Sequence, residues 1–144
     1  MLSQTAEYAL RAVVYLAEQA DPGLIPVGDI AVALDVPANY LSKILHQLAR
    51  AGVAESTRGP HGGFRLARPA ELIGLADVIE PFDSLEHRRR CLLGRPECSD
   101  RHPCGAHERW KHVKNQTTDF FRDTSVADVL ARSSAAVRKP KALN

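Results

Sequence analysis

Two helical segments joined by a tight turn, with a glycine-rich loop directly after them, constrain this chain most strongly. Apolar residues recur at helical spacing over 27–34 and 38–51, and an Asp-Val-Pro turn at 35–37 separates the two segments. Its proline suits the start of the second helix, and Gly52 is placed to end that helix. Two helices joined by so short a turn predict a helix-turn-helix unit.

A β-hairpin is predicted immediately after this unit. Residues 53–57 and 64–67 have strand-like patterns, and the loop 58–63 between them holds one proline and three glycines, which favour a tight, exposed turn. The segment 39–68 contains five Lys or Arg residues and one acid, a local charge of +4 in a chain whose net charge is +2. Localised positive charge is the electrostatic pattern expected of a DNA-binding surface.

The candidate DNA-binding residues follow from this arrangement, because the second helix of such a unit enters the major groove with its N-terminal residues facing the base edges. Asn can pair with adenine, Lys can contact guanine or phosphate, and an arginine in a glycine-rich loop can enter a narrow minor groove. The candidates are Asn39, Tyr40, Ser42, Lys43 and His46 of the helix and Arg58, His61 and Gly62 of the loop. At this point a plain pair of packed helices followed by an ordinary hairpin remains an alternative.

The other periodic segments are helical, so the fold class is mainly α with one small β-hairpin. Apolar spacing predicts further helices over about 4–19, 69–80 and 107–122, and Ser125 caps a last short helix that ends near residue 130. The predicted domains are a winged helix-turn-helix domain (1–82), a cysteine-rich loop without periodicity (83–106), a long C-terminal helix followed by a short one (107–132) and a flexible tail (133–144).

All three cysteines lie in the unpatterned stretch. Six residues separate Cys91 from Cys98, five separate Cys98 from Cys104, and His107 follows after two more. Thiolate and imidazole groups are ligands of iron–sulfur clusters and of zinc, but this spacing lacks the two CxxC units of a zinc ribbon. Three thiolates with one other donor can hold a small iron–sulfur cluster, and a ligand other than cysteine would leave it open to oxygen, nitric oxide or redox change.

The sequence also indicates a compartment and excludes some functions. The chain does not open with a basic stretch followed by an apolar run, and no apolar run approaches the roughly 18 residues of a membrane span. We therefore expect a cytoplasmic protein without membrane partners, in which clustered cysteines bind metal or are redox-active rather than forming disulfides. No nucleophile–base pair, phosphate-binding loop or organic-cofactor motif accompanies the cysteines, so we expect no enzyme.

Three segments resemble the Rrf-type winged-helix regulators, in the IscR- and NsrR-like branch that binds an iron–sulfur cluster. They are SQTAEYALRAVVYLA, NYLSKILHQLARAGVAESTRGPHGGFRLAR and LADVIE, and the resemblance covers roughly residues 1–132. It implies a homodimer, joined through the helix that begins at His107, that binds a pseudo-palindromic operator of double-stranded DNA with Arg58 in the minor groove. Two residues depart from the family pattern: His61 replaces a usual Gly, which bears on operator preference, and Phe64 replaces a usual Tyr.

The resemblance also implies a ligand set. In the branch that this region resembles, three cysteines and one histidine bind a [2Fe–2S] cluster, and the CxxHxxW motif at Cys104, His107 and Trp110 is similar to that branch. The gap after Cys91 is one residue longer than the usual five. In other branches the fourth ligand is an acid from the first helix of the partner subunit, and Glu7 occupies the matching place. We prefer His107, because it lies beside Cys104.

The leading prediction is a transcription regulator, a repressor or an activator, whose operator affinity responds to an iron–sulfur cluster. One alternative keeps the DNA-binding domain and makes the cysteines a zinc site or a thiol-redox switch. Another is a small redox or electron-transfer protein with no role at DNA, which would leave the glycine-rich loop and the local positive charge unexplained.

Overall fold

The structure is a computed structural model that describes residues 1–19, 23–85 and 90–136, with side chains described as far as residue 131. In chain order the elements are α1 (Gln4–Glu18), α2 (Val27–Leu34), α3 (Ala38–Arg50), β1 (Ala54–Thr57), β2 (Gly63–Leu66), the 3-10 turn η1 (Ala70–Leu72), α4 (Leu75–Ile79), α5 (His107–Asp123) and α6 (Val126–Ala136). In the described part of the chain, no helix combines the length and the apolar character needed to cross a membrane.

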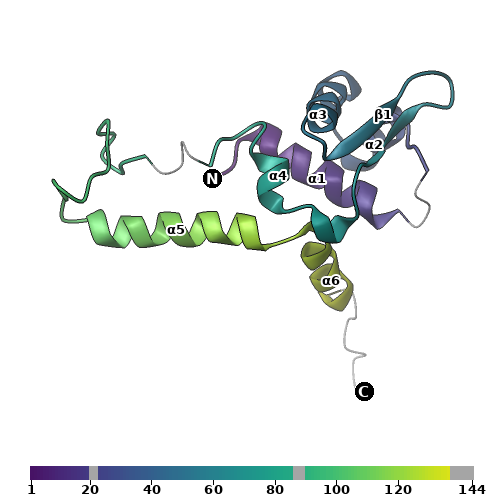
Figure 1. Cartoon of the computed structure of the whole chain (residues 1–144). Helices are drawn as coiled ribbons and strands as arrows, with labels where there is room; N and C mark the ends of the chain where they lie inside the picture. The colour runs from purple at the N-terminus through teal and green to yellow at the C-terminus, as the bar shows by residue number, and fades with distance from the viewer. Residues whose placement is uncertain (20–22, 86–89, 137–144) are drawn as a thin grey trace, which may run out of the picture.

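The molecule has two visibly different parts (Figure 1). Residues 1–85, here called the head, pack α1 to α4 and the hairpin into one body, with α6 against it. The long helix α5 runs away from the head and carries residues 90–106, here called the cysteine loop, at its far end (Figure 1). This arrangement confirms the predicted fold class of a mainly helical chain with one small hairpin.

The core of the head is built on α1 and α3. Ser3 caps α1 by accepting a hydrogen bond at Oγ from the backbone N–H of Ala6, and alanines on the inner face of α1 allow the neighbouring helices to approach closely. The apolar face of α3 is fully inside, as the spacing of its leucines and isoleucine predicts. The buried side chains of these two helices are Ala6, Ala9, Ala12, Val13, Leu16, Leu41, Ile44, Leu45 and Leu48.

The turns of the helix-turn-helix unit form where the sequence predicts them. Asp35 ends α2 in the left-handed conformation with φ 54°, and the Val36 N–H donates to the Ala31 carbonyl at 3.0 Å. Gly52 follows α3 with φ 76°, a conformation that glycine adopts without the Cβ clash of other residues. The chain turns at this glycine and continues into β1.

The hairpin is antiparallel, with Ala54 opposite Leu66 and Thr57 opposite Gly63. Its tip requires Gly62, because a Cβ there would lie 2.1 Å from the Thr57 carbonyl oxygen. The close approach of the hairpin backbone to itself explains the glycine at position 62. The predicted strands are correct to within one residue at each end.

Two predicted segments differ from the structure. The single helix expected over 69–80 is split into η1 and α4, because Ile73 and Gly74 are extended and pair with the junction between α5 and α6. There the Val126 N–H donates to the Ile73 carbonyl at 2.9 Å. The last helix, expected to end near residue 130, continues to Ala136, so the first four residues of the predicted flexible tail are helical. The rest of that tail, 137–144, lies outside the described residues.

Candidate nucleic-acid interface and candidate metal centre

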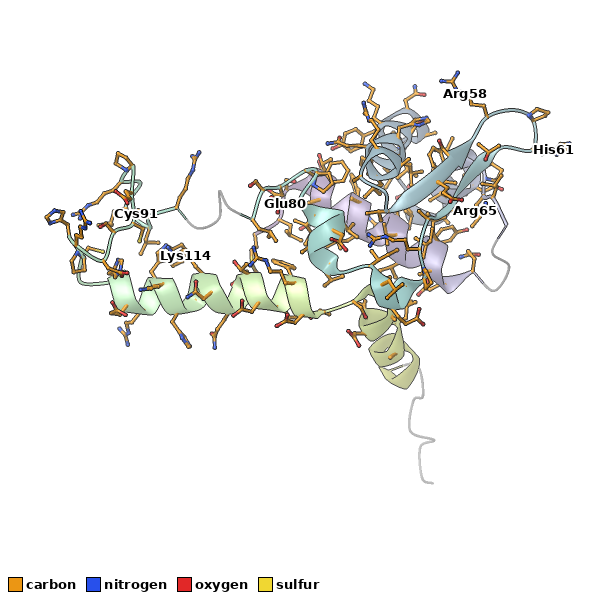
Figure 2. The ribbon with its side chains drawn as sticks, viewed as in Figure 1. Arg58, His61, Arg65, Glu80, Cys91 and Lys114 are labelled. Atoms are coloured by element: carbon orange, nitrogen blue, oxygen red, sulfur yellow. The ribbon has the colours of Figure 1, made fainter. Side chains whose placement is uncertain are left out.

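The predicted DNA-binding residues lie on one side of the head. Asn39, Lys43 and His46 are exposed on α3, and Ser42 is half-buried beside them. Figure 2 shows Arg58 and His61 at the tip of the hairpin, pointing away from the body of the head. Arg58, His61 and the exposed α3 side chains are thus open to solvent.

Two of these residues also hold the head together. The Tyr40 hydroxyl is hydrogen-bonded to the Thr5 hydroxyl, and its ring stacks edge-to-face on Tyr8 with centroids 5.8 Å apart. The His46 ring meets the Phe64 ring edge-to-face at 5.1 Å, which ties α3 to β2. The sequence prediction placed Tyr40 and His46 in the DNA interface and missed these contacts, which depend on the packing of α3 against α1 and the hairpin.

Some of the basic side chains near this surface are already paired with acids, and others are not. Arg65 Nε pairs with Glu55 at 2.8 Å across the hairpin, and Arg68 pairs with Asp77 at 3.5 Å. Arg58 is exposed, and no carboxylate among the described residues forms an ion pair with it. Arg58 is therefore free to contact an external anion such as a DNA phosphate, whereas Arg65 and Arg68 are already engaged.

The cysteine loop is fastened to α5 near its first residue. The indole N–H of Trp110 donates to the carbonyl oxygen of Arg90 at 3.0 Å, so the chain just before Cys91 is held against the first turn of the helix. Trp110 is half-buried at the head-distal end of α5 and acts here through its N–H group.

Cys98 is the cysteine whose sulfur lies beside His107. Its Sγ is 3.5 Å from His107 Nδ1. The backbone N–H groups of Leu93 and then Arg95 hydrogen-bond to the Cys91 sulfur and lower its thiol pKa. His107 itself is only 4% exposed.

Two residues at this centre were missed by sequence reasoning. Asp100 Oδ1 lies 2.7 Å from His107 Nε2, and Lys111 Nζ lies 2.9 and 3.0 Å from the two Asp100 carboxylate oxygens. Lys111, followed by His107, lowers the pKa of the Asp100 carboxyl, and the same contact raises the pKa of Lys111. The one signal in the sequence was the position of Asp100, an acid between two cysteines.

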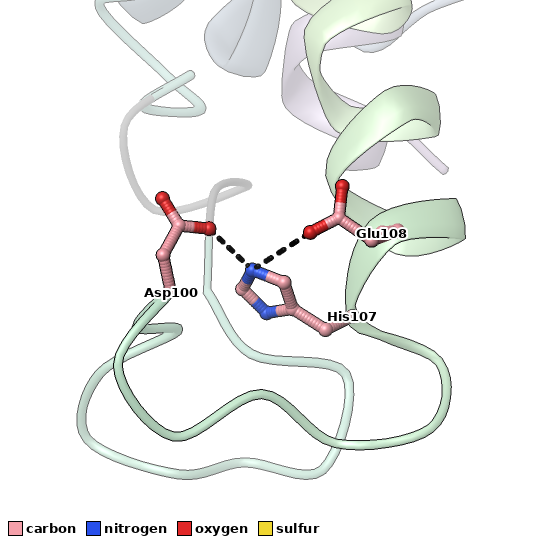
Figure 3. A group of neighbouring side chains, drawn as sticks. All are labelled: Asp100, His107 and Glu108. Atoms are coloured by element: carbon pink, nitrogen blue, oxygen red, sulfur yellow. Dashed lines mark hydrogen bonds and ion pairs between the residues drawn. The ribbon is translucent and has the colours of Figure 1, made fainter.

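The donor set at this end of α5 fits an iron–sulfur cluster in its chemistry. It combines thiols with one imidazole, all three cysteines are free, and Cys104 is linked to His107 by a backbone hydrogen bond of 2.9 Å. Within the described residues, the one group of potential ligands whose atoms all lie within 4.8 Å of one another is Asp100, His107 and Glu108 (Figure 3). Of the three sulfurs, that of Cys98 lies beside the imidazole, and no cysteine belongs to this group of three ligand atoms.

The alternative ligand Glu7 is in the other part of the molecule. It is an exposed residue of α1, on the head, and it joins no cysteine in a ligand group of the described residues. Figure 2 shows Cys91 at the end of the molecule opposite the hairpin tip. Within one chain, His107 is therefore the donor that the fold brings to the cysteines.

Comparison with known proteins then gives the family. The Rrf2 family, described as "Iron-dependent Transcriptional regulator", matches residues 2–132. The chain belongs to the Rrf2 family. A relative from Aquifex aeolicus (strain VF5), which carries the name of an HTH-type transcriptional regulator, is 38% identical over 132 residues and covers 90% of this chain and 91% of its own.

Two further Rrf2-type proteins extend this finding. The HTH-type transcriptional regulator IscR of Vibrio vulnificus (strain YJ016) is 27% identical over 130 residues, covering 90% of this chain and 77% of its own. The solved structure of CymR, the global cysteine regulator of B. subtilis, superposes with a TM-score of 0.76 at 20% identity over 92% of this chain and 97% of its own. The relatives are transcriptional regulators and not enzymes, and this Rrf2 protein is a DNA-binding winged-helix regulator.

Proposed function

We infer that this Rrf2 protein is a cytoplasmic regulator whose operator affinity depends on an iron–sulfur cluster, most simply [2Fe–2S], held by Cys91, Cys98, Cys104 and His107. The contact of 3.5 Å between Cys98 Sγ and the buried His107 Nδ1 carries this inference. The description of the family as iron-dependent supports it. A bound cluster would supply a centre sensitive to oxygen, nitric oxide or redox change.

The connection between this centre and the DNA-binding surface runs through α5. Its 17 residues make a rod about 25 Å long with the cysteine loop at one end. At the other end Phe121 is buried, and the Leu75 N–H donates to the Thr124 carbonyl at 2.9 Å. A change in the cysteine loop that shifted α5 would therefore act directly on α4 in the head.

A homodimer through α5 completes the proposal. Val113 and Phe120 are large apolar side chains of this helix that are 49% and 53% exposed. Beside them is an apolar hollow of about 350 Å³, lined by Met1, Leu85, Trp110, Val113, Lys114, Thr117 and Thr118. Two copies joined here would carry two heads, and the two heads suit two half-sites of a pseudo-palindromic operator read by α3 and the hairpin tip.

The decisive experiment combines composition with DNA binding. Protein purified without oxygen is analysed for iron, sulfide and zinc, and its visible spectrum is recorded. Its affinity for a DNA fragment selected in vitro with the same protein is then measured before and after cluster removal. We expect about two iron and two sulfide per chain and at least a fivefold difference in DNA affinity, the lower end of typical coupling. Equal affinity of the two forms would overturn the proposal.

A zinc site or thiol-redox switch is the second candidate, and the lowered thiol pKa of Cys91 favours it, because a thiolate is the reactive form. A colourless protein that takes up no iron after reconstitution would support this candidate. Its DNA affinity should then change with treatment by hydrogen peroxide or a zinc chelator. The DNA-binding role is common to both candidates.

A further inference from the structure

The polar contacts of His107 define how its ring is held. Its Nε2 lies 2.7 Å from Asp100 Oδ1, and its Nδ1 lies 3.5 Å from Cys98 Sγ (Figure 3 shows the Asp100 side). An ionised carboxylate only accepts hydrogen bonds, so Nε2 is the ring nitrogen that donates to Asp100. In the neutral ring that makes this bond, the lone pair is on Nδ1, which faces the Cys98 sulfur.

Asp100 is itself held in place. Lys111 donates to both of its carboxylate oxygens, at 2.9 and 3.0 Å. Lys111 is four residues after His107 on α5, so both side chains project from the same face of the helix. The helix therefore fixes the two groups, His107 and Lys111, that the carboxylate of Asp100 bridges.

We propose, on the basis of the proposed function, that Asp100 is a positioning residue that orients His107 to bind the cluster through Nδ1, with Lys111 holding Asp100. Metal-binding histidines commonly donate their second ring N–H to a carboxylate, and loss of that partner weakens metal retention about 10–100-fold. The buried ring of His107 has the matching pair of contacts, a carboxylate on one nitrogen and a thiol on the other.

Glu108 provides the matched control. Its Oε1 is 4.0 Å from His107 Nε2, too far for a hydrogen bond, and its side chain is 83% exposed. Glu108→Gln and Asp100→Asn remove the same charge at two sites that differ in their contact with the ring. Asp100→Ala removes the contact as well, whereas Lys111→Arg keeps a donor for Asp100.

The first test uses the cluster-free full chain and does not depend on iron. Nitrogen NMR of the histidine side chains should show His107 protonated on Nε2 and unprotonated on Nδ1, in the wild type and in Glu108→Gln. Asp100→Ala should lose this single tautomer. A wild-type ring protonated on Nδ1, or on both nitrogens, would overturn the inference, because Nδ1 would then have no lone pair to donate.

The second test uses the cluster-loaded protein. Pulsed electron paramagnetic resonance of the reduced cluster should show a histidine nitrogen coupling that changes in Asp100→Ala, and cluster loss to a chelator should be about 10–100-fold faster. Glu108→Gln should match the wild type, and Lys111→Arg should stay close to it. An Asp100→Ala cluster with unchanged coupling and loss rate would overturn this inference alone. A wild-type chain that takes up no cluster would overturn the proposed function and the ligand assignment with it.

Discussion

The head and the cysteine loop are held by different kinds of interaction. Apolar side chains from α1, α3 and α4 fill the core of the head, and Phe121 and Val126 from the C-terminal helices join them. The cysteine loop contributes no buried side chain between residues 90 and 106. It is held to α5 by polar contacts, made by Trp110 with Arg90 and by Lys111 and His107 with Asp100.

This difference has a consequence for function. An apolar core gives a cooperative unit that is rigid enough to present α3 to DNA, whereas a segment with few buried apolar groups opens at low free energy. A low-stability segment is suited to respond to a ligand, because a small change in binding free energy is a large fraction of its own stability. A stable head beside a loop of low local stability is the arrangement that the proposed response to a cluster requires.

The strongest test of this comparison removes a large side chain from each part. Leu45→Ala, at a fully buried position of α3, should lower the free energy of unfolding by about 2–5 kcal/mol, because it leaves a cavity in the core. Leu92→Ala in the cysteine loop, where the side chain is 54% exposed, should change it by less than about 0.5 kcal/mol. Urea denaturation followed by circular dichroism measures both, and equal losses would contradict the comparison.

Glycine substitutions test the backbone in the same way. Gly62→Ala places a Cβ against the Thr57 carbonyl, so we expect a loss of about 1–3 kcal/mol in stability or a distorted hairpin with weaker DNA binding. Gly105→Ala in the cysteine loop meets no atom within 4 Å and should leave both properties unchanged. The two variants are compared by denaturation and by binding to DNA selected in vitro, and an unaffected Gly62→Ala would show that the hairpin tip relaxes freely.

Much of the head could be predicted from the sequence, because its helices are specified by apolar residues at regular spacing. The spacing of Leu41, Ile44, Leu45 and Leu48 is enough to specify a helix and its buried face, and the glycines around 58–63 specify the hairpin turn. The break in the helix expected over 69–80 could not be predicted, since it depends on the pairing of Gly74 with Ser125, 51 residues further along the chain.

The centre at the end of α5 could be predicted only in part. Clustered cysteines followed by His107 indicate a ligand site whatever path the loop takes. The partners of His107 depend on that path, because Asp100 reaches the ring only after the loop folds back onto α5. No periodic pattern in the sequence predicts that the loop folds back onto α5. The hydrogen bond from Trp110 to Arg90 could not be predicted for the same reason.

Removing one positive charge from each part should affect DNA affinity differently in the head and in the cysteine loop. Arg58→Ala at the hairpin tip should weaken binding to the selected DNA about tenfold and reduce the salt dependence of binding by about one counterion. Arg101→Ala removes the same charge from an exposed site in the cysteine loop and should leave DNA affinity unchanged. Fluorescence anisotropy at several salt concentrations gives both values. A similar loss in the two variants would mean that net charge, rather than the hairpin, determines affinity.

The smallest expected effect is the most specific to the cysteine loop. Trp110→Phe keeps the aromatic ring but removes the N–H that binds the Arg90 carbonyl, a hydrogen bond whose net contribution is about 0.5–1.5 kcal/mol. Amide hydrogen exchange should therefore become faster in residues 90–106, while exchange in the head stays unchanged, because no apolar contact of the core is lost. Gln116→Ala changes an exposed polar side chain on the same helix and should accelerate neither region. Faster exchange throughout the head in Trp110→Phe would show that the loop and the core open as one cooperative unit, and the division between a stable head and a separately responsive loop would then be wrong.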